Sequence, residues 1–246
     1  MKHLTATLVS VLAACASAPP ASAPQRTPSA APAAPAAHGA PHHADHGDHV
    51  GQGMHHRFDN ADQWAKMFDD PARDAWQQPD RVIAELDLTP TLTVADVGAG
   101  TGYFAVRIAP KVPQGQVIAT DIEPDMVRYL TERARREQLP NLRAQIATAH
   151  DAGLAPASVD RVLVVDVWHH LADRVAYARS LAQALRPGGK LVIVDFSLDA
   201  RRGPPRQHRL APEAIISDLR AAGLDAKLSS TTLPEQYIVT ATRTGG

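Results

Sequence analysis

The feature that most constrains the fold is an alternation of apolar runs with helix-like stretches from residue 93 onward. The apolar runs are near-continuous in Val, Ile, Leu and Ala, as strands buried on both faces of a parallel sheet require. Strands that alternate with helices predict an open α/β sheet with right-handed crossovers. The predicted strands are 93–97, 116–121, 142–148, 160–167 and 190–196, and the predicted helices between them are 102–109, 125–138 and 174–185.

The regions on either side of this alternation have a different pattern. A helix at 212–222 is followed by strand-like runs at 226–232 and 237–242 with a short turn between them, which predicts an antiparallel hairpin on the sheet edge. Upstream, residues 58–68 and 79–86 are predicted helices, the first of them capped by Asp59 or Asn60. The aromatic face of the first helix favours packing against the core, and a cap over a ligand pocket is the alternative.

The first 15 residues are typical of an export signal. A basic start precedes an uncharged stretch at 4–14, which is too short for the roughly 20 residues that span a bilayer. The run Leu-Ala-Ala-Cys at 12–15 resembles the lipobox of bacterial lipoproteins, in which the signal is cut before the cysteine. That resemblance implies a signal peptide at 1–14, a lipid on Cys15 and a membrane-anchored protein on the periplasmic side of the cell envelope. An ordinary signal peptide is the alternative, and Ala16 after the cysteine favours the outer membrane.

Residues 15–54 form a predicted disordered tether that is rich in Ala, Pro and His. It has almost no large apolar residues, so burial cannot offset the entropy of ordering it. Four histidines are candidate ligands for a divalent metal, held only loosely because no rigid scaffold fixes them. They are His42, His43, His46 and His49. A single cysteine excludes multi-cysteine zinc sites, and a net charge of -1 with 4% aromatic residues argues against a nucleic-acid partner.

In the domain at 55–246, a glycine loop follows the first predicted strand. Its sequence is Gly98-Ala99-Gly100-Thr101-Gly102. Its glycines let the backbone turn sharply, and ligands of open α/β sheets bind at this end of the strands. Tyr103 stands where the last glycine of a dinucleotide-binding loop would be, which disfavours a nicotinamide oxidoreductase. Asp121 ends the second strand, where a carboxylate can accept hydrogen bonds from both hydroxyls of a ribose.

Together these motifs resemble those of the class I S-adenosylmethionine-dependent methyltransferases, over residues 79–242. The resemblance implies a Rossmann-like seven-stranded sheet of order 3-2-1-4-5-7-6, with strand 7 antiparallel and a helical cap at 55–78. It also implies S-adenosyl-L-methionine as the cofactor, with Asp121 on the ribose and Ile122 on the adenine. The cofactor-binding residues that it implies are Asp96, Gly98, Gly100, Gly102, Asp121, Ile122, Asp151 and Asp166.

The expected reaction is in-line methyl transfer to a small molecule, and a base is needed where the acceptor arrives protonated. The candidate bases are His169, His170 and His208, with His170 favoured over His169. Arginines near His208 are candidates for holding an anionic substrate, and a purely structural role is the alternative for each histidine. Because an exported enzyme has no obvious supply of cofactor, the rival interpretation is an envelope-anchored, non-catalytic protein that binds a nucleoside or a metal.

Overall fold

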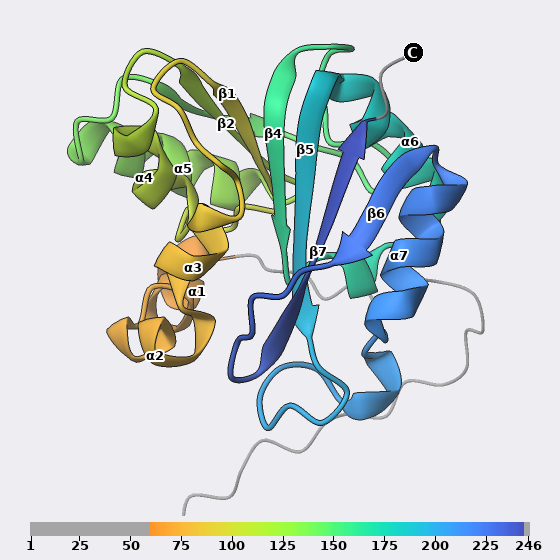
Figure 1. Cartoon of the computed structure of the whole chain (residues 1–246). Coiled ribbons are helices and arrows are strands. Elements are labelled where there is room, and N and C mark those ends of the chain that lie inside the picture. Colours follow the sequence, from red (N-terminus) through yellow and green to blue (C-terminus); the bar gives the residue numbers. More distant parts are fainter. Residues whose placement is uncertain (1–59, 244–246) are drawn as a thin grey trace, which may run out of the picture. The chain divides into compact units, whose positions relative to one another are not determined.

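A computed structural model describes residues 60–243, which form a helical cap and an α/β domain (Figure 1). The domain has one seven-stranded sheet of order β3-β2-β1-β4-β5-β7-β6. Strands β1 to β5 are parallel, and β7 is antiparallel to both of its neighbours. The predicted fold class and strand order are therefore confirmed.

The sheet is built from β1 (Thr93–Val97), β2 (Gln116–Asp121), β3 (Leu142–Ile146), β4 (Val159–Val165), β5 (Leu185–Phe196), β6 (Leu224–Leu228) and β7 (Gln236–Arg243). The main helices are α1 (Ala61–Phe68), α2 (Asp74–Gln77), α3 (Pro79–Ala84), α4 (Ala105–Ile108), α5 (Pro124–Arg136), α6 (Arg174–Ala184) and α7 (Pro212–Ala221). Short 3-10 turns lie at η1 (Pro71–Arg73), η2 (Ala109–Lys111), η3 (Trp168–His170) and η4 (Arg206–His208).

Helices cover both faces of the sheet, so the central strands are buried on both sides (Figure 1). Helices α4 and α5 pack on one face together with α3, and α6 and α7 pack on the other. The sequence of α5 shows why this helix packs on the sheet. Pro124 favours the start of the helix, and Met126, Leu130 and Ala134 recur every four residues and form its buried face. This arrangement leaves the carboxyl ends of β1, β2, β4 and β5 free to build a site.

The cap consists of helices α1 and α2, and α1 is fastened to α5. Asn60 caps α1, as the sequence predicts, by accepting a hydrogen bond from the Gln63 backbone at 3.3 Å. The Ala61 backbone N–H donates to Asp125 of α5 at 2.6 Å. Polar contacts thus help to hold a segment that has few fully buried residues of its own.

Two predicted boundaries are wrong in detail. The helix expected at 102–109 is shorter, because the glycine loop runs on to Phe104 before α4 begins. The strand expected at 190–196 begins earlier, at Leu185, and contains a bulge: Leu185 pairs with Val159 and Lys190 with Arg161, so four residues of β5 lie opposite one of β4. Over residues 60–243 no helix is long and apolar enough to cross a membrane.

Candidate active site

The glycine loop turns back onto the end of β2. The backbone N–H groups of Gly98 and Ala99 both donate to the Thr120 carbonyl, at 2.8 and 3.0 Å. Gly98 has a φ of +69°, and a Cβ there would lie 2.3 Å from a Val167 methyl. Glycine is therefore required at this turn for both conformation and space.

Asp121 connects the end of β2 to the glycine loop. One carboxylate oxygen accepts a hydrogen bond from the Gly100 N–H at 2.8 Å, and the other accepts from the Glu123 N–H at 2.9 Å. Burial raises the pKa of Asp121, and these backbone hydrogen bonds oppose the rise. Two backbone bonds leave further lone pairs on both oxygens, enough to accept two ribose hydroxyls.

Asp96 lies at the end of β1, directly before the loop. Its side chain is almost fully buried, and one carboxylate oxygen, Oδ2, has no hydrogen-bond partner within the described part of the chain. Burial raises the pKa of Asp96 to about 7. A buried polar atom without a hydrogen-bond partner is costly, so this oxygen is a candidate acceptor for a hydrogen bond from a ligand.

These residues fit the cofactor that the sequence motifs imply. A Cβ on Gly100 would meet only the ring of Phe68 from the cap, at 3.5 Å, so a ligand can approach the main chain here. Ile122 follows Asp121 and is about half exposed, which leaves an apolar side chain free to cover a base. Asp121, Asp96 and Ile122 thus offer a hydroxyl acceptor, a cation acceptor and an apolar contact along one edge of the sheet.

Asp151 lies in the loop after β3. Its carboxylate accepts a hydrogen bond from the Gly153 N–H at 2.6 Å, and its own backbone bonds to Thr148 close the turn. The side chain is exposed, so its remaining lone pairs are accessible to a ligand. His150 lies in the same turn, and its backbone N–H also donates to the Thr148 hydroxyl at 3.3 Å.

Asp166 follows β4 and adopts a left-handed conformation with a φ of +59°. It accepts a hydrogen bond from the Gln236 amide at 2.5 Å, and the guanidinium of Arg73 lies 4.0 Å away. Burial, and secondly the charge of Asp195, raise the pKa of Asp166 to about 7. Gln236 also accepts a hydrogen bond from Gln77 of α2, so the cap reaches this carboxyl directly.

The adjacent histidines have different surroundings. His169 is buried, and its Nδ1 lies 2.8 Å from Asp195, which is fully buried at the end of β5. Burial alone would lower the pKa of His169, but the hydrogen bond to Asp195 and the charges of Asp195 and Asp166 outweigh it, so the pKa is raised. His170 is partly exposed, and its ring lies 4.2 Å from that of His169. His169 therefore has a buried carboxylate partner that fixes the orientation of its ring.

His208 lies on η4, after β5, and its side chain is exposed. The neighbouring Arg209 has a structural role: its guanidinium donates to the carbonyls of Ala200, Pro204 and Arg202 at 2.6, 2.8 and 3.0 Å. This arginine is occupied in shaping the loop after β5. It is not available to hold an anionic substrate as the sequence suggested.

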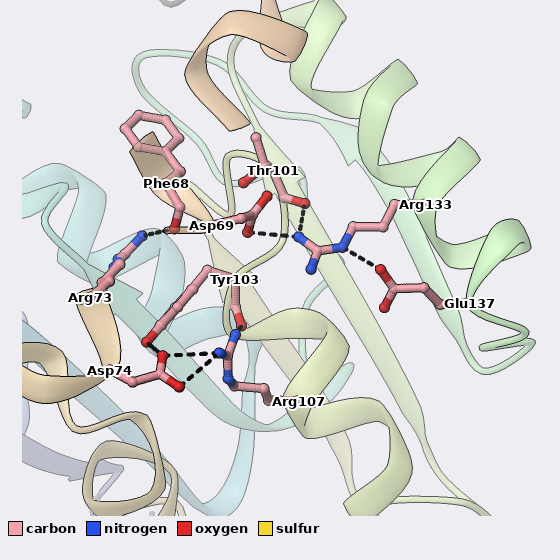
Figure 2. Close-up of polar contacts among 9 residues, drawn as sticks. All are labelled: Phe68, Asp69, Arg73, Asp74, Thr101, Tyr103, Arg107, Arg133 and Glu137. Carbon is pink, nitrogen blue, oxygen red and sulfur yellow. Dashed lines mark hydrogen bonds and ion pairs between the residues drawn. The ribbon is translucent and has the colours of Figure 1, made fainter. Parts of the chain in front are cut away.

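Polar contacts fasten the cap beside the glycine loop (Figure 2). Arg133 of α5 joins Asp69 at 2.8 Å and donates to the Thr101 carbonyl at 3.0 Å. The Tyr103 hydroxyl donates to Asp74 of α2, which also pairs with Arg107 at 3.0 Å. Tyr103, expected only to obstruct a dinucleotide, is therefore an attachment point for the cap.

Sequence reasoning missed four residues of the site: Arg73, Gln77, Asp195 and Gln236. Asp195 carried a usable signal, because it stands near the end of a predicted strand as Asp96 and Asp121 do.

The metal candidates His42, His43, His46 and His49, and the lipidation candidate Cys15, lie outside the described residues. Within 60–243 no group of three or more metal-ligating side chains comes together.

Comparisons with known proteins agree with this geometry. Residues 94–189 match the family described as "Methyltransferase domain". An uncharacterised methyltransferase of Mycobacterium tuberculosis is 34% identical over 145 residues, which cover 58% of this chain and 53% of that protein. A demethylmenaquinone methyltransferase of Deinococcus radiodurans is 30% identical over 103 residues, or 42% of each chain. The chain thus spans about half the length, or less, of these curated relatives.

The fold has a match among solved structures. A crystal structure of a SAM-dependent methyltransferase from Aquifex aeolicus superimposes with a TM-score of 0.69 at 25% identity, covering 76% of this chain and all of that one. Its match extends well beyond the 94–189 region. In fold, motif geometry and relatives the domain is thus similar to the S-adenosylmethionine-dependent methyltransferases, and its residues fit S-adenosylmethionine as the cofactor.

Proposed function

We propose that this protein transfers a methyl group from S-adenosylmethionine to a small-molecule acceptor. The observation that carries the proposal is the contact of Asp121 with the Gly100 N–H, at 2.8 Å. That contact places a candidate ribose-binding carboxylate beside the half-buried glycine backbone at the carboxyl ends of β1 and β2. The cofactor supplies an activated methyl group on a sulfonium, so the protein has mainly to position the reactants.

The acceptor site is proposed at the ends of β4 and β5. His169 is oriented by Asp195 through Nδ1, which leaves Nε2 as the atom that takes a proton from the acceptor. Trp76 of α2 stacks on Phe196 with ring centroids 5.9 Å apart, which provides an apolar surface at the same end of the sheet. A small acceptor with an ionisable hydroxyl, acidic C–H or amine fits these groups.

Calorimetric titration of the full chain tests cofactor choice. We expect S-adenosylhomocysteine to bind with one site per chain and NADH to give no heat. Tight binding of NADH without S-adenosylhomocysteine binding would refute the proposal. A panel of phenols, quinols and amines incubated with S-adenosylmethionine then tests turnover through the formation of S-adenosylhomocysteine, with His169→Ala as the variant that should lose it and His208→Ala as its matched control.

We also propose that the chain is anchored to the cell envelope by a lipid on Cys15, with residues 15–54 as a tether. The support is the sequence pattern alone: a basic start, a short apolar stretch and a cysteine at the end of a lipobox-like run. Radiolabelled fatty acid should appear on the wild-type protein and be absent from Cys15→Ala. Absence of label from both proteins would refute the anchor and leave the methyltransferase proposal untouched.

A further inference from the structure

The loop at 197–208 follows β5 and lies at the end of the sheet where the cap lies (Figure 1). Two contacts fix the middle of this loop. A Cβ on Gly203, which has a φ of +86°, would lie 2.6 Å from the Phe196 ring, so the loop backbone lies directly on that ring. The carbonyl of the preceding Arg202 accepts a hydrogen bond from the Arg209 guanidinium at 3.0 Å. The backbone of Arg202 is therefore held in place.

The side chain of Arg202 is exposed, and its guanidinium carbon lies 5.9 Å from the centre of the Trp76 ring. Trp76 is half-buried and stacks on Phe196, which is buried and directly follows Asp195 in β5. Asp195 in turn lies 2.8 Å from His169. A positive charge and two aromatic rings thus follow one another from the surface toward the His169–Asp195 pair.

The charge of Arg202 is not neutralised by a carboxylate of the part of the chain at 60–243. It forms no ion pair there, whereas Arg107 and Arg133, which fasten the cap, each pair with an aspartate. The loop at 197–208 has three arginines and one aspartate, so it carries a net positive charge. A positioned guanidinium beside aromatic rings suits a ligand that has an anionic group next to an apolar part.

We propose that Arg202 binds an anionic group of the methyl acceptor, a carboxylate or a phosphate, while the Trp76–Phe196 pair contacts the acceptor's apolar part. The inference rests on the proposed function and narrows its acceptor to molecules that have both features. The rival explanation is that Arg202 only covers the face of Trp76 as a surface cation–π contact. The two explanations differ in whether loss of the guanidinium changes the binding of an anion.

The test is calorimetry on the full chain saturated with S-adenosylhomocysteine. The probes are p-coumarate, its neutral amide, and phenyl phosphate. In the wild type, p-coumarate and phenyl phosphate should bind more tightly than the amide. Arg202→Gln should weaken the two anions roughly 3- to 30-fold, between the values for an exposed ion pair and for a hydrogen bond to a charged group, and change the amide by less than about twofold. Weakening of only one anion supports the inference and identifies the group that Arg202 binds.

Arg206→Gln is the matched control, because it removes the same charge from the same loop. The Arg206 guanidinium donates to the Leu198 carbonyl at 3.2 Å, and this arginine has no contact with Trp76 within the described chain. Both anion affinities should therefore stay within about twofold of wild type at physiological salt. Equal weakening by the two variants would show a diffuse effect of loop charge and would overturn the inference, as would unchanged anion affinities in Arg202→Gln.

The outcomes separate this inference from the proposed function. Arg202→Lys keeps the charge but not the planar fork, so it should retain part of the anion affinity, and it carries the comparison if the glutamine variant does not fold. If wild type binds S-adenosylhomocysteine but neither anion, or binds the amide as tightly as p-coumarate, the inference fails while the proposed function stands. If wild type does not bind S-adenosylhomocysteine, the proposed function fails and the inference fails with it.

Discussion

Replacing Asp121 by Asn tests the nucleoside site at its most constrained residue. The carboxylate accepts backbone hydrogen bonds on both oxygens, from Gly100 at 2.8 Å and from Glu123 at 2.9 Å. An ionised carboxylate has about four acceptor sites, so two remain for ribose hydroxyls. The amide of Asn has one oxygen, and its NH₂ group cannot accept from either backbone N–H.

The expected changes in stability and in ligand affinity follow from these hydrogen bonds. One backbone N–H loses its acceptor, which costs about 1–3 kcal/mol of unfolding free energy. A ribose hydroxyl loses a charged acceptor, which corresponds to roughly 10- to 150-fold in affinity for S-adenosylhomocysteine. Calorimetry gives the affinity and urea unfolding gives the stability. Asp125→Asn is the matched control, because Asp125 accepts from Ala61 at 2.6 Å on the cap side of α5 and has no part in the nucleoside site. An unchanged affinity in Asp121→Asn would refute the assignment of the ribose site.

Three further predictions concern the loop, the buried dyad and the segment after β5. Gly102→Ala should lower the unfolding free energy, measured by urea unfolding, by about 2–5 kcal/mol, because the φ of Gly102 is +94° and the new methyl would lie 2.2 Å from the Leu130 side chain. Gly188→Ala is the control: its φ is +74° but the space around it is open, so it should cost only about 1–2 kcal/mol. In an NMR titration, the pKa of His169 should lie above its ordinary value of about 6.5, and Asp195→Asn should lower it. Because the pKa is raised in the folded state, the His169–Asp195 pair stabilises the fold fully below about pH 6.5, and this stabilisation is lost as the pH rises through the folded-state pKa. Arg209→Ala should make the loop at 197–208 a faster site of tryptic cleavage than in the wild type, because the guanidinium bonds to several of its carbonyls, and equal cleavage rates would contradict that role.

The parts of the site that could be predicted are those set by local sequence. The glycine loop and the acids Asp96, Asp121 and Asp166 follow from strand ends and turn residues, which lie close together in the chain. The sheet brings these ends to one edge whatever the details of packing. The same logic extends to Asp195, which was overlooked because no glycine or turn signal follows it directly.

The contribution of the cap could not be predicted from local patterns. Gln77 and Gln236 are separated by 159 residues and meet in the interior, although glutamine is usually a surface residue. Arg73 looks like any arginine near a turn, and its position beside Tyr103 and Asp166 depends on other elements of the fold. Long-range polar contacts of this kind arise from tertiary packing and leave no periodic trace in the sequence.

A crystal structure of the full chain with S-adenosylhomocysteine is the most direct test of the central claim. We expect both ribose hydroxyls within hydrogen-bonding distance of the Asp121 carboxylate. Density for the ligand at another edge of the sheet, or an Asp121 side chain turned away from the ribose, would contradict the account.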